Sequence, residues 1–258
     1  MIRLGTMNNP ARDPVKEIIR AAELGFEFLD LTLEPPACRA CDLDPVRIKN
    51  ALSAHGLGVV GHTAYYLPFA SAFDAVQAGA ITEAVACLRF FAQVGANRMN
   101  LHLDCRVPGY GTEYVNARNI AAIEKMLPVA DDLGIRLMVE NVEGDTAASL
   151  APVLNTLPTV GLHLDIGHAN IGGNGRKSHT ADLLAAYADR LMHVHVSDNK
   201  GKSDDHLAIG AGTIDWKREL RTLKATGYDD TITLETFYGD TELVRYSASK
   251  VRETWRTI

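Results

Sequence analysis

The stretch that decides the fold is LMHVHVSDNKGKSDDHLAIGAGTIDW, residues 191–216. It opens like a buried strand, in which His193 and His195 stand at alternate positions and so share one face. Asp204 and His206 follow one residue apart in a polar loop, before a Gly-Ala-Gly turn. Imidazoles and carboxylates are ordinary ligands of divalent metals. Core histidines and solvated loop residues would give the same local pattern, so the rest of the chain must decide.

One arrangement recurs along the chain. An amphipathic helix ends at a glycine, a short apolar run rich in β-formers follows, and a polar residue stands where that run ends. The apolar runs predict strands at residues 2–6, 26–31, 57–61, 98–101, 135–139, 160–164, 191–194 and 231–234. The other segments predict helices at residues 14–24, 45–54, 73–94, 113–133, 146–155, 180–190, 215–225 and 241–255.

Eight strand–helix units in this length predict an α/β fold, a single (β/α)8 barrel domain over residues 1–258. Strands that alternate with helices require a parallel sheet with right-handed crossovers. An open doubly wound sheet is the alternative. It is disfavoured because no strand leads through a GxGxxG turn into a helix, and the glycines at 172, 173 and 175 follow a ligand-like loop instead.

The composition predicts a soluble, cytoplasmic protein with a large core. Hydrophobic residues make up 47% of the 258, charges break every apolar run well before eighteen residues, and the N-terminus lacks the apolar stretch of a signal peptide. We expect no membrane contact. The net charge of −6 argues against a broad basic surface for nucleic acid, although it allows a local basic groove. Cys38 and Cys41 form an isolated CxxC pair, which we interpret as reduced and structural.

Metal-capable residues stand at the ends of six consecutive predicted strands. In a barrel the carboxyl ends of the strands meet at one rim, so these side chains should converge. Packing alone explains one or two such residues but not six, so the sequence predicts a metal site. Carboxylates with imidazoles and no thiolate suit zinc, manganese, cobalt or magnesium, with one to three ions per chain. The six residues are His62, His102, Glu140, Asp165, His195 and Glu235.

The remaining histidines are interpreted as structural. His55, His163, His179 and His193 fit surface positions or places behind the ligands. His163 alternates with Asp165, so an inward position behind the metal ligands is also compatible with the sequence.

Several motifs resemble those of the xylose isomerase-like TIM-barrel superfamily, which includes sugar-phosphate isomerases and epimerases and also the endonuclease IV family of apurinic-site nucleases. The motifs are LDIGHA at 164–169, HVSDNK at 195–200, the loop DDH at 204–206 that ends in Gly-Ala-Gly, and LET at 234–236. The resemblance covers nearly the whole chain.

The resemblance implies two ligand sets. The metal site shared across the superfamily falls on Glu140, Asp165, His195 and Glu235, and the additional ligands of endonuclease IV fall on His62, His102, His168, Asp204 and His206. Two positions depart from the family pattern. Ala211 stands where a glutamate is usual, and Gly201 stands where ketose 3-epimerases carry an arginine.

The first functional hypothesis is an isomerase or epimerase of a sugar or sugar phosphate. A metal would chelate a carbonyl and its neighbouring hydroxyl and lower the cost of an ene-diolate, with Glu140 and Glu235 as base and acid. His168 would hold a hydroxyl, and Tyr65 and Lys200 are further predicted substrate contacts.

Two other hypotheses stay open. An endonuclease IV-like zinc phosphoesterase acting on abasic DNA would need a way to hold DNA, whereas Arg106, Tyr110, Arg176 and Lys177 are scattered loop residues that we interpret as solvated. A non-catalytic barrel that merely binds a metal or sugar is disfavoured, because two glutamates usable for proton transfer are present. A homo-oligomer is compatible with the sequence.

Overall fold

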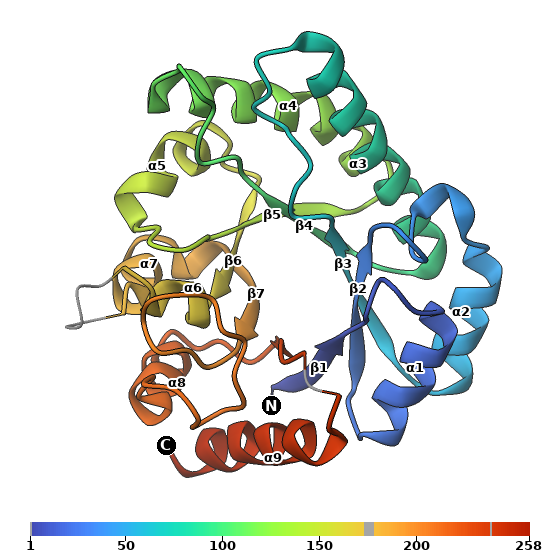
Figure 1. The fold of residues 1–258 in the computed structure, drawn as a ribbon, viewed down its shortest axis with the longest axis vertical. Helices are drawn as coiled ribbons and strands as arrows, with labels where there is room; N and C mark the ends of the chain where they lie inside the picture. The colour runs from blue at the N-terminus through green and yellow to red at the C-terminus, as the bar shows by residue number, and fades with distance from the viewer. Residues whose placement is uncertain (1, 173–177, 238) are drawn as a thin grey trace.

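The computed structural model describes residues 2–172, 178–237 and 239–258, and its parallel strands close into one barrel. The strands form a ring in chain order (Figure 1). Each strand pairs with its neighbours, and β8 closes the ring by pairing with β1. This confirms the predicted (β/α)8 barrel. The strands are β1 (Arg3–Met7), β2 (Phe28–Leu33), β3 (Gly58–Thr63), β4 (Arg98–His102), β5 (Arg136–Glu140), β6 (Gly161–Asp165), β7 (Leu191–Val196) and β8 (Thr231–Leu234).

Helices surround the barrel on the outside (Figure 1). They are α1 (Pro14–Glu23), α2 (Pro45–Ala54), α3 (Asp74–Val94), α4 (Thr112–Asp132), α5 (Ala147–Thr156), α6 (Ile166–Asn170), α7 (Thr180–Tyr187), α8 (Trp216–Ala225) and α9 (Thr241–Thr257). Aspartates cap several of them. Asp13 and Asp44 each accept a hydrogen bond from a backbone N–H of the first turn and are followed by a proline, which suits the first helical position.

Two helices differ from the sequence prediction. The predicted helix 180–190 ends at Tyr187 and continues as a tighter 3-10 turn, Ala188–Arg190. The short helix α6 is not predicted at all, because its five residues, IGHAN, are too few to show a helical periodicity. Asp165 begins this helix, since its side chain accepts a hydrogen bond from the backbone N–H of His168.

Helix α3 is long and apolar enough to cross a membrane by its length and composition alone. In the barrel it packs against β3 and lies between α2 and α4, and its buried face contributes Leu88 and Phe91 to the main hydrophobic core. The packing of α3 in the core of the barrel therefore accounts for its apolar residues.

The interior of the barrel carries an apolar layer beneath a polar one. Phe28, Val60, Met138 and Met192 form a cluster separate from the main core, and they come from strands that are not all neighbours, so they meet inside the ring. Phe28 needs room there, because a side-chain carbon added at Gly5 would lie 2.4 Å from its ring. Two residues further along three of these strands, on the same face, come Asp30, His62 and Glu140.

Candidate metal centre

Glu140, the last residue of β5, lies at the centre of the polar layer. Its Oε2 is 3.1 Å from Nε2 of His102 and 3.4 Å from Nε2 of His62, the two histidines predicted at neighbouring strand ends. His62 donates a hydrogen bond from Nδ1 to the carbonyl oxygen of Thr63 at 2.8 Å, which leaves Nε2 to face Glu140. The amide of Asn100 donates to both this Nε2 and Glu140. These contacts bring β3, β4 and β5 together at one carboxylate.

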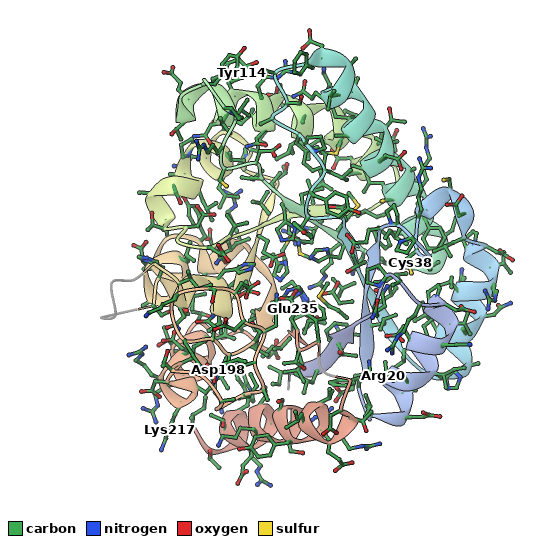
Figure 2. All side chains as sticks on the ribbon, viewed as in Figure 1. Arg20, Cys38, Tyr114, Asp198, Lys217 and Glu235 are labelled. Carbon is green, nitrogen blue, oxygen red and sulfur yellow. The ribbon has the colours of Figure 1, made fainter. Side chains whose placement is uncertain are left out.

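Four predicted ligands form one compact group. One ligand atom each from Glu140, Asp165, His195 and Glu235 can be chosen so that all lie within 4.8 Å of one another, and all four residues are buried. Nδ1 of His195 is 3.1 Å from Glu235 Oε2, 3.6 Å from Glu140 Oε1 and 3.8 Å from Asp165 Oδ2. In Figure 2, Glu235 lies near the middle of the ring, while Lys217 and Tyr114 lie on outer helices.

Asp165 shows that this group fits a divalent cation. Its Oδ1 accepts from the backbone N–H of His168 at 2.6 Å, whereas its Oδ2 is buried without a hydrogen-bond partner among the described residues. Burial raises the pKa of Asp165. The charge of His168 lowers this pKa, the charges of Glu235 and Glu140 raise it, and the resulting pKa is about 7. Three carboxylates and one imidazole in a buried space form a donor set that a cation would neutralise.

The other two carboxylates of this group are held ionised by histidines. Burial would raise the pKa of Glu140, but His163, His102 and His195 hold it well below its usual range. Burial acts in the same direction on Glu235, and His195 and His206 lower its pKa overall. Both glutamates are therefore ionised at neutral pH.

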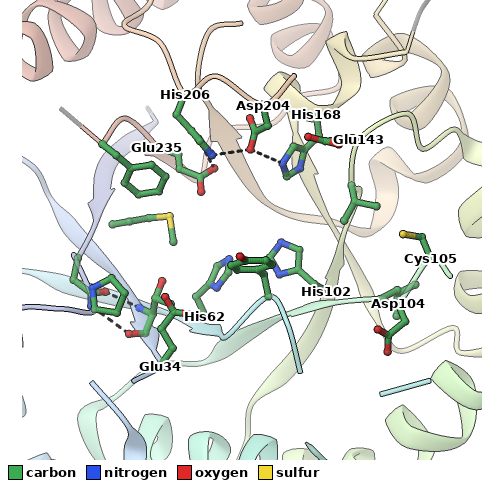
Figure 3. Close-up of a pocket in the computed structure, with 18 of the residues that line it drawn as sticks. Glu34, His62, His102, Asp104, Cys105, Glu143, His168, Asp204, His206 and Glu235 are labelled. Carbon is green, nitrogen blue, oxygen red and sulfur yellow. Dashed lines mark hydrogen bonds and ion pairs between the residues drawn. The ribbon is translucent and has the colours of Figure 1, made fainter. Parts of the chain in front are cut away.

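The predicted loop ligands form a second group beside the first. Asp204 Oδ2 lies 2.6 Å from His206 Nε2 and 3.2 Å from His168 Nε2, as the dashed lines in Figure 3 show. Burial would lower the pKa of His168, but Asp165 and the hydrogen bond to Asp204 raise it to about 11. Burial would also lower the pKa of His206, but the hydrogen bond to Asp204 and the charge of Glu235 raise it to about 9.

The loop that carries Asp204 and His206 is tied to the barrel through Asp198. This buried carboxylate accepts hydrogen bonds from the backbone N–H of Gly210 at 2.8 Å and from the indole of Trp216 at 2.9 Å. The backbone of Asp198 also pairs with Leu207 in both directions. The departure from the family pattern at Ala211 lies in the turn of this loop and removes none of the predicted ligands.

A cavity of about 680 Å³ opens above the two groups. Tyr65, His168 and Glu235 line it, together with Arg106, Phe237 and Glu34. Tyr65, predicted to contact substrate, is 69% exposed, and its ring meets that of His102 edge-on. Figure 3 shows Glu34 near His62 on one side, and Cys105 with Asp104 on another.

Lys200 is a further predicted substrate contact. Among the described residues it does not line this cavity, and its side chain is exposed. Its backbone N–H donates to Asp205 at 3.1 Å, and the chain turns at Gly201, whose φ is +75°. Of the loop residues considered for DNA contact, Arg106 lines the cavity and Tyr110 stacks on Tyr114, while Arg176 and Lys177 lie outside the described residues.

The structure reveals polar residues inside the barrel that the sequence analysis either did not identify or assigned to more than one possible position. Asp30, in the middle of β2, is fully buried and accepts hydrogen bonds from His193 and His195. His193 and His163 are themselves buried inside the ring, not on the surface, and Nδ1 of His163 lies 3.2 Å from Glu140. His55 is exposed after α2. The signal that could have revealed Asp30 is a carboxylate in the strand FLDLTL, whose other residues are apolar except for Thr32.

Comparison with known proteins gives one family and several relatives. Residues 18–254 match the family described as xylose isomerase-like TIM barrel. An uncharacterized protein of Methanocaldococcus jannaschii is 32% identical over 166 residues, which cover 58% of this chain and 56% of that relative. The L-ribulose 3-epimerase of a Methylomonas species is 25% identical over 259 residues, covering 94% of this chain and 84% of that enzyme.

A solved structure shows the same fold. The crystal structure of a D-tagatose 3-epimerase-like protein superposes with a TM-score of 0.83 at 22% sequence identity, covering 97% of this chain and 98% of that chain.

Proposed function

This chain belongs to the xylose isomerase-like TIM-barrel family, and on that premise we propose that it is a divalent-metal-dependent epimerase or isomerase of a sugar or sugar phosphate. The observation that carries the proposal is the convergence of Glu140 and Glu235 on one buried group, beside a cavity of about 680 Å³. They come from β5 and β8, which are not adjacent in the ring, so they can approach a substrate from different sides.

Glu140, Asp165, His195 and Glu235 would hold the cation. Bound there, a divalent cation would polarise the carbonyl of a keto sugar together with the hydroxyl on the neighbouring carbon, and so acidify the C–H bond of that carbon. The Methylomonas relative is named an L-ribulose 3-epimerase, and two further relatives are named a ketose 3-epimerase and an L-ribulose-5-phosphate 3-epimerase.

The two glutamates supply the proton transfers. One carboxylate takes the proton from carbon, and the other returns a proton, which gives the epimer when the two act on opposite faces. His168 would hold a substrate hydroxyl. Two observations support this role: its Nδ1–H donates to the carbonyl of Asn141 at 2.9 Å, which fixes the ring, and its side chain lines the cavity. Tyr65 and Phe237 would cover the substrate from the solvent side.

The experiment is proton exchange in D₂O. The metal-loaded protein is incubated with a panel of ketoses and ketose phosphates, and deuterium at the carbon next to the carbonyl is followed by NMR. We expect exchange and formation of the epimer with at least one member, and no formation of the epimer with E235Q that retains its metal. Epimer formation by E235Q would remove the proton-transfer role of Glu235. No exchange across the panel would count against the proposed reaction.

A second candidate function rests on a specific observation. His62 and His102 face Glu140, and His168 and His206 face Asp204, so the described residues offer ligands for further ions on both sides of the central four. Such a set suits a zinc phosphoesterase of the endonuclease IV kind, in which clustered ions activate water. Elemental analysis of protein purified without chelators or a histidine tag separates the two. Close to one ion per chain favours the epimerase, and close to three zincs makes abasic DNA the next substrate to test.

A further inference from the structure

Asp30 lies behind the candidate metal centre, within the barrel and away from the cavity. Its side chain is fully buried in β2. One oxygen, Oδ2, accepts three hydrogen bonds, from His195 Nε2 at 2.7 Å, from His193 Nε2 at 3.0 Å and from the hydroxyl of Thr233 at 3.0 Å. The other oxygen, Oδ1, has no hydrogen-bond partner among the described residues. A buried carboxylate surrounded by donors on one side is a costly feature to keep in a core.

His195 connects this carboxylate to the metal centre. Its Nε2 points to Asp30, and its Nδ1 points to Glu235, Glu140 and Asp165 at 3.1, 3.6 and 3.8 Å. A carboxylate can only accept, so the hydrogen bond at 2.7 Å requires a proton on Nε2. In the neutral ring the lone pair then lies on Nδ1 and faces the other three ligands.

We propose that Asp30 is a positioning residue that keeps the proton of His195 on Nε2 and thereby presents Nδ1 as the ligand for a divalent cation. The inference rests on the metal centre of the proposed function and adds a residue that touches neither metal nor substrate. An ionised carboxylate behind a ligating imidazole fixes its orientation and raises the basicity of the ligating nitrogen.

The partners of His193 show why the important donor is His195. His193 has alternatives to Asp30, because its Nδ1 lies 2.7 Å from the hydroxyl of Thr231 and its Nε2 lies 2.9 Å from the hydroxyl of Thr233. Among the described residues, Nε2 of His195 has its hydrogen bond and its ion pair with Asp30 alone. Loss of the Asp30 charge should therefore affect the hydrogen bonding of His195 more than that of His193.

The test compares D30N with T233V. D30N keeps the shape of the side chain but removes its charge, while T233V removes another donor to the same carboxylate without touching His195. Both variants are stripped of metal, and their affinity for Co²⁺ is measured by competition with a chromophoric chelator, without substrate. We expect D30N to bind Co²⁺ about tenfold to hundredfold more weakly than the unaltered protein, and T233V to stay within about twofold of it.

Equal effects of the two variants would overturn the proposal, since they would report only a disturbed core. A second measurement does not depend on the folding of D30N. In the unaltered, Zn²⁺-loaded protein with ¹⁵N-labelled histidine, NMR should show His195 ligating through Nδ1 with a proton on Nε2. Ligation through Nε2 would contradict the role of Asp30. Neither readout uses catalysis, so tight metal binding without deuterium exchange would refute the proposed function and leave this inference standing.

Discussion

The carboxylate of Asp198 accepts a hydrogen bond from the indole nitrogen of Trp216 at 2.9 Å, and this contact joins the end of β7 to the start of α8. Both side chains are buried. The segment between them carries Asp204 and His206, and Asp198 also accepts from the backbone of Gly210 within that segment. The loop ligands are thus held by a closed set of contacts at both ends of the loop.

Replacing Trp216 should weaken the contacts through which Asp198 holds this loop. In W216F the ring still fills much of the site, but Asp198 loses a charge-assisted donor, which we expect to lower the free energy of unfolding by about 2 kcal/mol. Urea denaturation measures the change. W255F is the matched control, because Trp255 is also buried and its ring contacts Lys224, not a carboxylate. A larger loss in W255F than in W216F would show that ring volume, not the hydrogen bond, dominates.

Gly212 provides a second test of the same loop. A side-chain carbon at this position would lie 2.2 Å from the backbone oxygen of Asn199 and 2.2 Å from Oδ1 of Asp198, so G212A must displace the loop. We expect a loss of about 1–3 kcal/mol in stability. G79A is the control, because Gly79 lies within α3 with open space around it, and alanine there should stabilise the helix by up to about 1 kcal/mol. Similar melting temperatures for the two variants would show that the loop tolerates the added atom.

Much of this arrangement could be predicted from the sequence because the barrel follows a repeated local rule. A glycine ends a helix, an apolar run forms a strand, and a polar residue stands at its end, so the residue pattern alone places His102 and Glu140 at one rim. Asp30 breaks the rule, since it lies within its strand and not at the end. Its role depends on His195, whose partners across the ring are set by tertiary packing.

Lys200 is a different case. It belongs to a motif of the family, but the position of its side chain depends on how the loop turns at Gly201, and loop geometry is weakly encoded in residue types. The prediction for His193 was imprecise for a related reason. The alternation of the strand places it on the same face as His195, yet the depth of each residue inside the barrel depends on register.

Substitutions of Asp165 and Asp204 should have very different effects on deuterium exchange if Glu140, Asp165, His195 and Glu235 form the working site. D165N removes a ligand charge and should lower deuterium exchange by about a hundredfold or more, whereas D204A, at the neighbouring group, should cost about tenfold or less. The measurement is the exchange rate in D₂O with the metal content of each variant determined in parallel. An equally severe loss in D204A would show that the loop group also takes part in the exchange reaction, so that the central four residues alone do not form the working site.

Asp230 lies at the opposite end of the barrel from the metal centre, and its ion pairs should make the stability of the protein depend on pH. It precedes β8 and forms ion pairs with Arg3 at 2.6 Å and Arg98 at 2.7 Å. Burial would raise the pKa of Asp230, but these two arginines lower it overall. A carboxylate whose pKa is lower in the folded than in the unfolded chain stabilises the fold above its unfolded pKa of about 3.9, and this stabilisation disappears as pH falls through the folded value.

D230N removes this charge and should therefore be less stable than the unaltered protein at pH 7, by about 1 kcal/mol because the pairs are partly exposed. The difference should shrink as pH falls below about 4, where the carboxylate of the unaltered protein also becomes protonated. Urea denaturation of both proteins from pH 3 to pH 7 measures it. A constant difference across that range would mean that the shape of the Asp230 side chain, and not its charge, holds β1, β4 and β8 together, because only the contribution of the charge varies with pH.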